Sequence, residues 1–105
     1  MLPSYCSQAD IIGGPLLDAW RALHANRLNV VHVLSREDDA TWEGERGHVS
    51  QALIAQHCPA PSEDSMVFVC GPPAMYQSLC GPRGEPELSG VLAQMGHEKS
   101  QVFKF

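Results

Sequence analysis

The chain has 105 residues, of which 44% are hydrophobic and 18% are charged, a composition that is typical of one globular domain. Its 7 lysines and arginines against 12 aspartates and glutamates give a net charge of −5, which argues against a nucleic-acid partner. No apolar run reaches the roughly 20 residues that a membrane span needs, and no secretory signal opens the chain. We therefore expect a cytoplasmic domain.

The four cysteines are Cys6, Cys58, Cys70 and Cys80, and none of them forms a C-x-x-C pair. Without a secretory context, we expect reduced thiols rather than disulfides, most of them buried as small apolar side chains. Zinc ligands usually come in pairs roughly two to four residues apart, and this spacing is absent. We therefore expect no metal site.

The first half of the chain predicts a weak edge strand over residues 2–6 and a helix that begins at Pro15, which suits a first helical turn. Asn26 is expected to end this helix in a left-handed conformation. Residues 28–34 are β-branched and almost continuously apolar, which predicts a buried parallel strand, and residues 35–47 predict a charged surface loop. The helix carries apolar side chains at three- and four-residue spacing on one face: Leu16, Leu17, Trp20, Leu23 and His24.

The second half continues the alternation of strands and helices. Ser50 is expected to open a helix that Pro59 ends, and Gly96 to stop a later one. The order β-α-β-α-β-α-α-β predicts an α/β fold, with a Rossmann-like, mostly parallel sheet flanked by helices. The expected elements are a helix over 50–58, a strand over 66–70, helices over 74–80 and 88–95, and a strand over 101–105.

Ligands of such sheets bind beyond the carboxyl ends of the strands. Two of these ends are polar, at Ser7-Gln8 and at Ser35-Arg36. In dinucleotide folds, an acid at such an end commonly accepts the ribose 2′-hydroxyl, whereas an arginine accommodates a 2′-phosphate. Neither Ser35 nor Arg36 repels a phosphate, and a solvated turn is the alternative interpretation of this segment.

The third strand end reads Cys70-Gly71-Pro72-Pro73. Gly71 allows another group to approach the backbone closely, and Pro73 suits the start of a helix. The segment could hold an anionic or aromatic ligand near the sulfur, or it could be a tight turn after a buried cysteine. The sequence contains no nucleophile elbow, phosphate loop or GxGxxG motif, and we expect His32 to be a structural or partly exposed residue.

Residues 70–75, CGPPAM, closely resemble the CGPPPM motif of the NADH–cytochrome b5 reductase family, with Ala74 in place of the third proline. The resemblance extends upstream over VLSREDDATWEGERGHVSQALIAQHCPAPSED, which is similar to the family's strand, Trp-containing loop, glycine, helix and Pro-x-Pro segment. SYCSQADI resembles a shortened form of another family strand, and VFKF resembles the family's aromatic C-terminal strand. The resemblance covers nearly all of the chain.

The resemblance implies an oxidoreductase that transfers a hydride from NADH or NADPH to FAD and passes single electrons to a heme protein such as cytochrome b5. It implies that Cys70 lies beside the nicotinamide and that Ser35 replaces an aspartate that selects NADH. Phe105 would bring the chain end towards the flavin domain. The implied cofactor-binding residues are Ser7, Gln8, Ser35, Arg36, Gly47, His48, Gly71, Pro72, Pro73, Met75 and Phe105.

The resemblance also implies that residues 1–105 are the C-terminal part of a ferredoxin-reductase-like NAD(P)-binding domain. The family's FAD domain, and the first, central strand with its glycine-rich turn, have no counterpart in this sequence. Without that strand, the family order 3-2-1-4-5 leaves two strand pairs, whose open edges could bind an FAD-domain polypeptide, an upstream segment or a second copy. We expect the chain alone to be inactive; the alternative is a non-catalytic α/β binding module that retains this fold.

Overall fold

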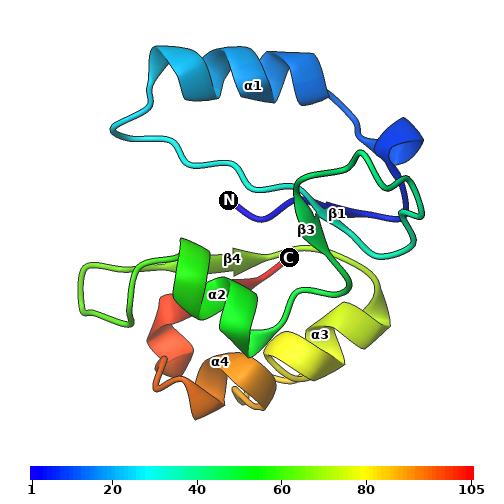
Figure 1. Cartoon of the computed structure of the whole chain (residues 1–105). Coiled ribbons are helices and arrows are strands. Elements are labelled where there is room, and N and C mark those ends of the chain that lie inside the picture. Colours follow the sequence, from blue (N-terminus) through cyan, green and yellow to red (C-terminus); the bar gives the residue numbers. More distant parts are fainter. The chain divides into compact units, whose positions relative to one another are not determined.

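The computed structural model describes residues 1–105 and divides into two compact units, Met1–Val49 (unit 1) and Ser50–Phe105 (unit 2) (Figure 1). Each unit combines parallel strands with helices, which confirms the expected α/β class. The strands form two sheets, β1-β2-β3 in unit 1 and β4-β5 in unit 2. Two strand pairs were expected; β4 and β5 form such a pair, whereas the sheet of unit 1 has a third strand. None of the helices has the length and apolar composition that a transmembrane span requires.

Unit 1 contains a parallel sheet in which β1 (Ser4–Tyr5) pairs with β2 (Val33–Leu34), and β2 pairs with β3 (Glu45–Arg46). The hydrogen bonding between the first two strands is longer than these bounds, because the amides of Val31 and Val33 donate to the carbonyls of residues 1 and 3, at 3.1 and 3.0 Å. Val30, Val33 and Leu34 are buried, as the apolar run predicted.

Strand β3 lies within the segment that was expected to be only a charged loop, and that expectation is wrong at this point. Its residues, Glu45 and Arg46, give no strand pattern in the sequence. The strand forms because its backbone pairs with β2, and the following amide, of Gly47, donates to the Leu34 carbonyl at 2.9 Å. Long-range backbone hydrogen bonds therefore decide this element.

Helix α1 (Gly14–Leu23) begins as predicted, with Pro15 in its first turn, but it ends before Asn26. No residue other than glycine has a positive φ, so the left-handed stop at Asn26 is wrong. The His24 carbonyl instead accepts the amides of Arg27 and Leu28, both at 2.8 Å, which closes the helix in a turn.

The apolar face of α1 is largely open to solvent. Leu16 is 53% exposed, Trp20 48% and Leu23 75%. The periodicity correctly indicated a helix with one apolar side, but the described residues do not cover that side.

Unit 2 opens with α2 (Gln51–His57), whose N-cap is Ser50, as predicted; the Ser50 Oγ accepts the Leu53 amide at 3.3 Å. The Gly96 stop is also confirmed, with φ at +93°. The remaining elements are β4 (Val67–Val69), α3 (Pro73–Leu79), α4 (Gly90–Gln94) and β5 (Val102–Lys104), with short 3₁₀ helices η1 (Gln8–Asp10) in unit 1 and η2 (Lys99–Gln101) in unit 2.

Helix α4 is shorter than the predicted 88–95. Gly90 has φ +71°, and because this left-handed conformation interrupts a regular helix, α4 does not extend back to residue 88. A Cβ atom on Gly90 would lie 2.4 Å from the carbonyl oxygen of Ser78. The close approach of these two backbone segments therefore requires glycine.

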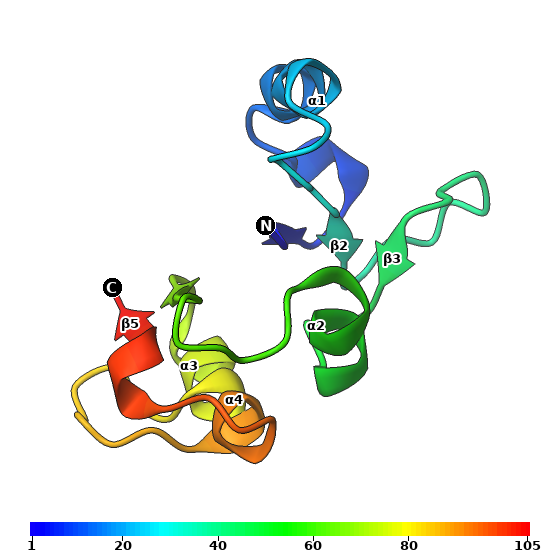
Figure 2. The ribbon, with the colours of Figure 1, turned by 90° about the vertical axis from the view of Figure 1, so that its left-hand side faces the viewer.

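Figures 1 and 2 show α3 and α4 side by side along one face of the parallel β4–β5 pair. The buried side chains of this layer include Val69, Tyr76, Leu79, Cys80 and Leu92. The Tyr76 hydroxyl donates to the Phe105 carbonyl at 2.6 Å, which fixes the C-terminal residue beside the end of β4. Burial raises the pKa of the Cys80 thiol.

The opposite face of the β4–β5 pair carries an exposed aromatic cluster of Phe68, Phe103 and Phe105. Phe68 is 62% exposed and the other two are each 51% exposed. The ring centroids of Phe103 and Phe105 are 5.0 Å apart, and each lies 6.1 Å from that of Phe68. An aromatic cluster of this kind on a strand face is normally covered by another element or chain.

Candidate functional site

The carboxyl ends of β1 and β2 bring together two of the segments that the sequence singled out. The amide of Ser35 donates to the Tyr5 carbonyl at 2.9 Å, and the amide of Arg36 donates to the Cys6 carbonyl at 2.8 Å. Ser7 and Gln8 follow directly, so predicted site residues from two strand ends lie at one edge of the sheet. We call Ser7, Gln8, Ser35, Arg36 and Glu37 the β1–β2 corner.

Glu37 is a member of this corner that sequence reasoning missed. Its Oε2 accepts the backbone amide of Gln8 at 2.7 Å, and its Oε1 accepts the amide of Asp39 at 3.0 Å. These two donors, the Gln8 amide first, hold the pKa of the Glu37 carboxyl below its usual range. The only signal in the sequence was its place two residues after Ser35, within an acidic run.

A second carboxylate occupies the neighbouring donors. Asp10 Oδ2 accepts both the amide and the hydroxyl of Ser7, at 2.9 and 2.8 Å. The backbone amides of Ser7 and Gln8 therefore already donate to carboxylates of this chain, and a bound phosphate would have to displace one of them.

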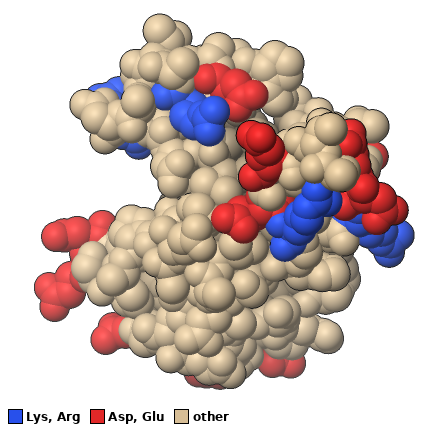
Figure 3. Space-filling model, viewed as in Figure 1, with Lys and Arg blue, Asp and Glu red and all other residues tan.

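Arg46 holds the loop that carries Glu37. Its guanidinium donates to the carbonyls of Glu37, Asp39 (2.6 Å) and Trp42 (3.1 Å). Asp39 also accepts both donors of Thr41 at 2.8 Å, which lowers the pKa of the Asp39 carboxyl. Figure 3 shows acidic and basic side chains gathered over this loop.

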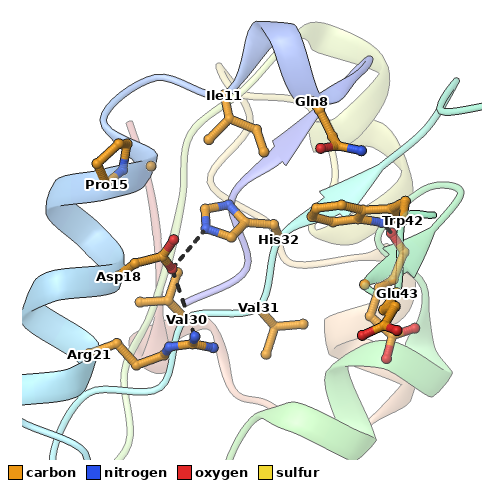
Figure 4. A pocket seen from close by; sticks show the side chains of 13 residues that line it. Gln8, Ile11, Pro15, Asp18, Arg21, Val30, Val31, His32, Trp42 and Glu43 are labelled. Carbon is orange, nitrogen blue, oxygen red and sulfur yellow. Dashed lines mark hydrogen bonds and ion pairs between the residues drawn. The ribbon is translucent and has the colours of Figure 1, made fainter. Parts of the chain in front are cut away.

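A cavity of about 640 Å³ opens within unit 1, and Gln8 of the β1–β2 corner lines it (Figure 4). Asp18 and Arg21 point into it from α1, opposite His32 and Trp42. Asp18 Oδ1 is 3.8 Å from both His32 Nε2 and Arg21 Nη2. His32 lines this cavity, and its Nδ1 atom is buried without a hydrogen-bond partner.

The turn after β4 forms a separate candidate site. Cys70 is exposed, which contradicts the alternative of a tight turn after a buried cysteine. Pro73 starts α3, as predicted, after Pro72 in an extended conformation. A Cβ on Gly71 would lie 2.5 Å from the sulfur of Met75, so these two residues pack against each other.

Two further predicted residues follow strand ends. Phe105 lies at the end of the β4–β5 pair, because its amide donates to the Val69 carbonyl at 3.0 Å. Val69 is the residue that precedes Cys70 in the sequence. Gly47 follows β3 with φ +90°, and His48 after it is exposed. The candidate residues therefore form one group in unit 1 and one in unit 2.

The expectation that most cysteines are buried is wrong. Only Cys80 is buried, whereas Cys58 is half-buried and Cys6 and Cys70 are exposed; all four are free thiols.

The family model of the oxidoreductase NAD-binding domain matches residues 4–81, and the chain belongs to this family. Among curated relatives, it is 40% identical over 100 residues to NADH-cytochrome b5 reductase 2 of Scheffersomyces stipitis, covering 91% of this chain and 33% of that protein. NADH-cytochrome b5 reductase 2 of Saccharomyces cerevisiae is 37% identical over 101 residues, with the same coverage. The resemblance to cytochrome b5 reductases is thus confirmed, and the chain spans about a third of these relatives.

The fold agrees with solved structures. The cytochrome b5 reductase domain of Ulva prolifera nitrate reductase superposes with a TM-score of 0.83 at 24% identity, over 99% of this chain and 37% of that one. The CS-b5R domains of human Ncb5or, in the NAD+ form, give a TM-score of 0.73 at 23% identity, over 97% of this chain and 26% of that one. These likenesses confirm the ferredoxin-reductase-like fold of a partial domain.

Proposed function

We propose that this chain is the C-terminal NAD(P)-binding portion of a cytochrome b5 reductase-like flavoenzyme. The observation that carries the proposal is the turn after β4, where an exposed thiol, Cys70, precedes a glycine packed on Met75 and a proline that starts a helix. An exposed glycine beside an exposed thiol suits the flat nicotinamide ring of a cofactor. The family of NAD-binding domains to which the chain belongs supports this assignment.

Each group of residues then has a distinct task. Cys70 positions the nicotinamide, and the β1–β2 corner contacts the adenosine end of the cofactor. The exposed imidazole of His48 can stack on the nucleotide, and Phe105 approaches the flavin-binding part of a complete enzyme. The remaining lining residues are Gly47, Gly71, Pro72, Pro73 and Met75.

In a complete enzyme, a nicotinamide held at the turn of Cys70 would supply a hydride to FAD, and single electrons would pass on to a heme protein such as cytochrome b5. These 105 residues offer polar groups for the adenosine end and a thiol turn for the nicotinamide, but no glycine-rich turn for the pyrophosphate. We expect the chain alone to lack reductase activity. Flavin-dependent ferricyanide reduction by the purified chain would contradict this expectation.

The exposed apolar faces support a further polypeptide partner, either an upstream segment or a separate FAD-domain chain. The aromatic cluster on β4–β5 and the apolar side of α1 are both open to solvent, and the chain spans about a third of its curated relatives. Covering such faces is the role that the rest of a complete reductase would have. Self-association through the same surfaces is the alternative, and analytical ultracentrifugation of the chain distinguishes a monomer from a second copy.

The role of Cys70 is tested in a complete reductase that carries this chain. Cys70→Ala should slow hydride transfer by about 10- to 100-fold, because misplacement by about 1 Å can have an effect of this order, while changing the nucleotide Kd by less than about twofold. Stopped-flow flavin reduction measures the first quantity. Cys58→Ala, a half-buried thiol outside the turn, is the control. An unchanged rate in Cys70→Ala would refute the assigned role.

The second candidate is a non-catalytic α/β binding module. One observation favours it: the Ser7 and Gln8 amides already donate to carboxylates of the chain, leaving them unavailable to a phosphate. Calorimetric titration with NADH separates the two functions. Binding in the micromolar range would exclude the second candidate, and the absence of any heat of binding would support it.

A further inference from the structure

We propose that Glu37 is a specificity-determining residue of the nucleotide site, whose carboxylate accepts the ribose 2′-hydroxyl of NADH and repels the 2′-phosphate of NADPH. This inference rests on the proposed function. The inference does not assign this role to Ser35 or Arg36, the two residues at this strand end. From these two residues the sequence did not decide between NADH and NADPH. It assigns the preference for NADH over NADPH to Glu37, which long-range hydrogen bonding brings to the β1–β2 corner.

The position of Glu37 carries the inference. Ser35 directly follows β2, but its hydroxyl donates to the Tyr5 carbonyl at 3.3 Å and carries no charge. Glu37 reaches across to the other strand end, where its Oε2 accepts the Gln8 amide at 2.7 Å. A carboxylate thus bridges the two strand ends at which dinucleotide folds recognise the ribose.

The charge at this corner is negative and its donors are already used. Two backbone amides on Glu37 favour its ionised form, and Asp10 accepts both donors of Ser7. A 2′-phosphate would meet two carboxylates and no free backbone amide on Ser7 or Gln8. A hydroxyl, by contrast, can donate to a remaining lone pair of Glu37.

The segment over residues 35–47 stays negatively charged although it contains Arg36 and Arg46, because it also contains five acidic residues. Arg46 directs its guanidinium at three carbonyls of the loop, which fixes the backbone that carries Glu37. Arg36 is exposed. Like charges at fixed positions repel, whereas the charge of an exposed arginine is screened by solvent and salt.

The test is calorimetric titration of the 105-residue chain with NADH and with NADPH. We expect the wild type to bind NADH at least about tenfold more tightly than NADPH, the order of effect of one fixed like charge. Glu37→Gln, which keeps one acceptor oxygen and removes the charge, should bring the ratio of the two Kd values towards one. The matched control, Asp38→Asn, removes the same charge from an exposed neighbour and should leave the ratio unchanged.

A second measurement does not depend on the variant folding. In the wild type, raising the salt concentration from about 50 to 500 mM should reduce the preference for NADH, because repulsion of the 2′-phosphate is screened. Any of four results would overturn the role of Glu37. These are equal Kd values of the wild type for NADH and NADPH, an unchanged Kd ratio in Glu37→Gln, an equally large change of this ratio in Asp38→Asn, or a preference for NADH that does not depend on salt. If neither nucleotide binds the wild type, the proposed function fails and the inference falls with it; NADH binding with an unaltered ratio removes only the inference.

Discussion

The two units of this chain fix their loops in the same way but build their cores differently. In unit 1, Arg46 donates to three carbonyls of the loop between β2 and β3; in unit 2, Lys104 donates to the carbonyls of Pro82, Glu85 and Glu87 at 3.2, 3.0 and 2.8 Å. Unit 2 adds a layer of buried apolar side chains under its sheet, whereas unit 1 leaves the apolar face of α1 exposed.

The two units therefore differ in what holds their candidate sites in place. In unit 2, the candidate turn at Cys70 follows a strand that packs against helices. The face of unit 2 that is visible in Figure 3 is mostly uncharged. Unit 1 places its candidate nucleotide corner on short strands tied by backbone and carboxylate hydrogen bonds. We therefore expect apolar truncation to affect unit 2 most, and charge or pH changes to affect unit 1 most.

The largest effect is expected from matched leucine truncations in the two units. Leu92 is 1% exposed, and Leu92→Ala should lower the free energy of unfolding of unit 2 by about 3 kcal/mol, through lost burial and a residual cavity. Leu23→Ala, at a leucine that is 75% exposed, should change stability by less than about 0.5 kcal/mol. Hydrogen exchange of amides in each unit measures both. Equal losses at the two sites would show that α1 is packed in solution.

A glycine pair tests the close backbone approach in unit 2. Gly90→Ala should destabilise by about 2 kcal/mol or more, because a side chain at φ +71° is strained and its Cβ would collide with the Ser78 carbonyl. Gly84→Ala has nothing within 4 Å of its Cβ and is the control. Urea unfolding gives the two values, and a tolerated Gly90→Ala would mean that α4 can shift.

Arg46→Gln tests the polar organisation of unit 1. Loss of the guanidinium contacts should lower the stability of the β2–β3 loop by about 1 kcal/mol and speed amide exchange there, with little change in unit 2. Arg21→Gln, whose carboxylate partner lies 3.8 Å away on an exposed helix face, should have almost no effect. If the amides of this loop exchange at equal rates in the two variants, Arg46 does not stabilise the loop.

The smallest effect is expected from acidification. The pKa values of Glu37 and Asp39 are lowered in the folded chain, so their stabilising contribution is present above the ordinary values of 4.5 and 3.8 and is lost as the pH falls through the lower folded values. Between pH 6 and 3, the Gln8 amide should therefore lose protection before the amides of β4. Nuclear magnetic resonance of these amides measures the order, and simultaneous loss would contradict it.

Local signals allowed much of the fold to be predicted from the sequence. The helix start at Pro15, the Ser50 cap and the Gly96 stop depend on neighbouring residues, and all three are confirmed. The apolar run over 28–34 indicated a buried strand, because β-branched side chains favour extended backbone, but the strand is limited to Val33–Leu34. The CGPPAM motif likewise pointed to the family and to the turn after β4.

The amino-acid sequence by itself determined the α/β class, the element order apart from β3, and the family, because periodicity, caps and motifs are local properties of the chain. Only the tertiary structure decided that Glu45–Arg46 is a strand, that Cys70 is exposed, and that Glu37 joins Gln8 at the β1–β2 corner. The Gln8 and Glu37 partners are 29 residues apart in sequence, and no local pattern records which polar groups long-range pairing will bring together.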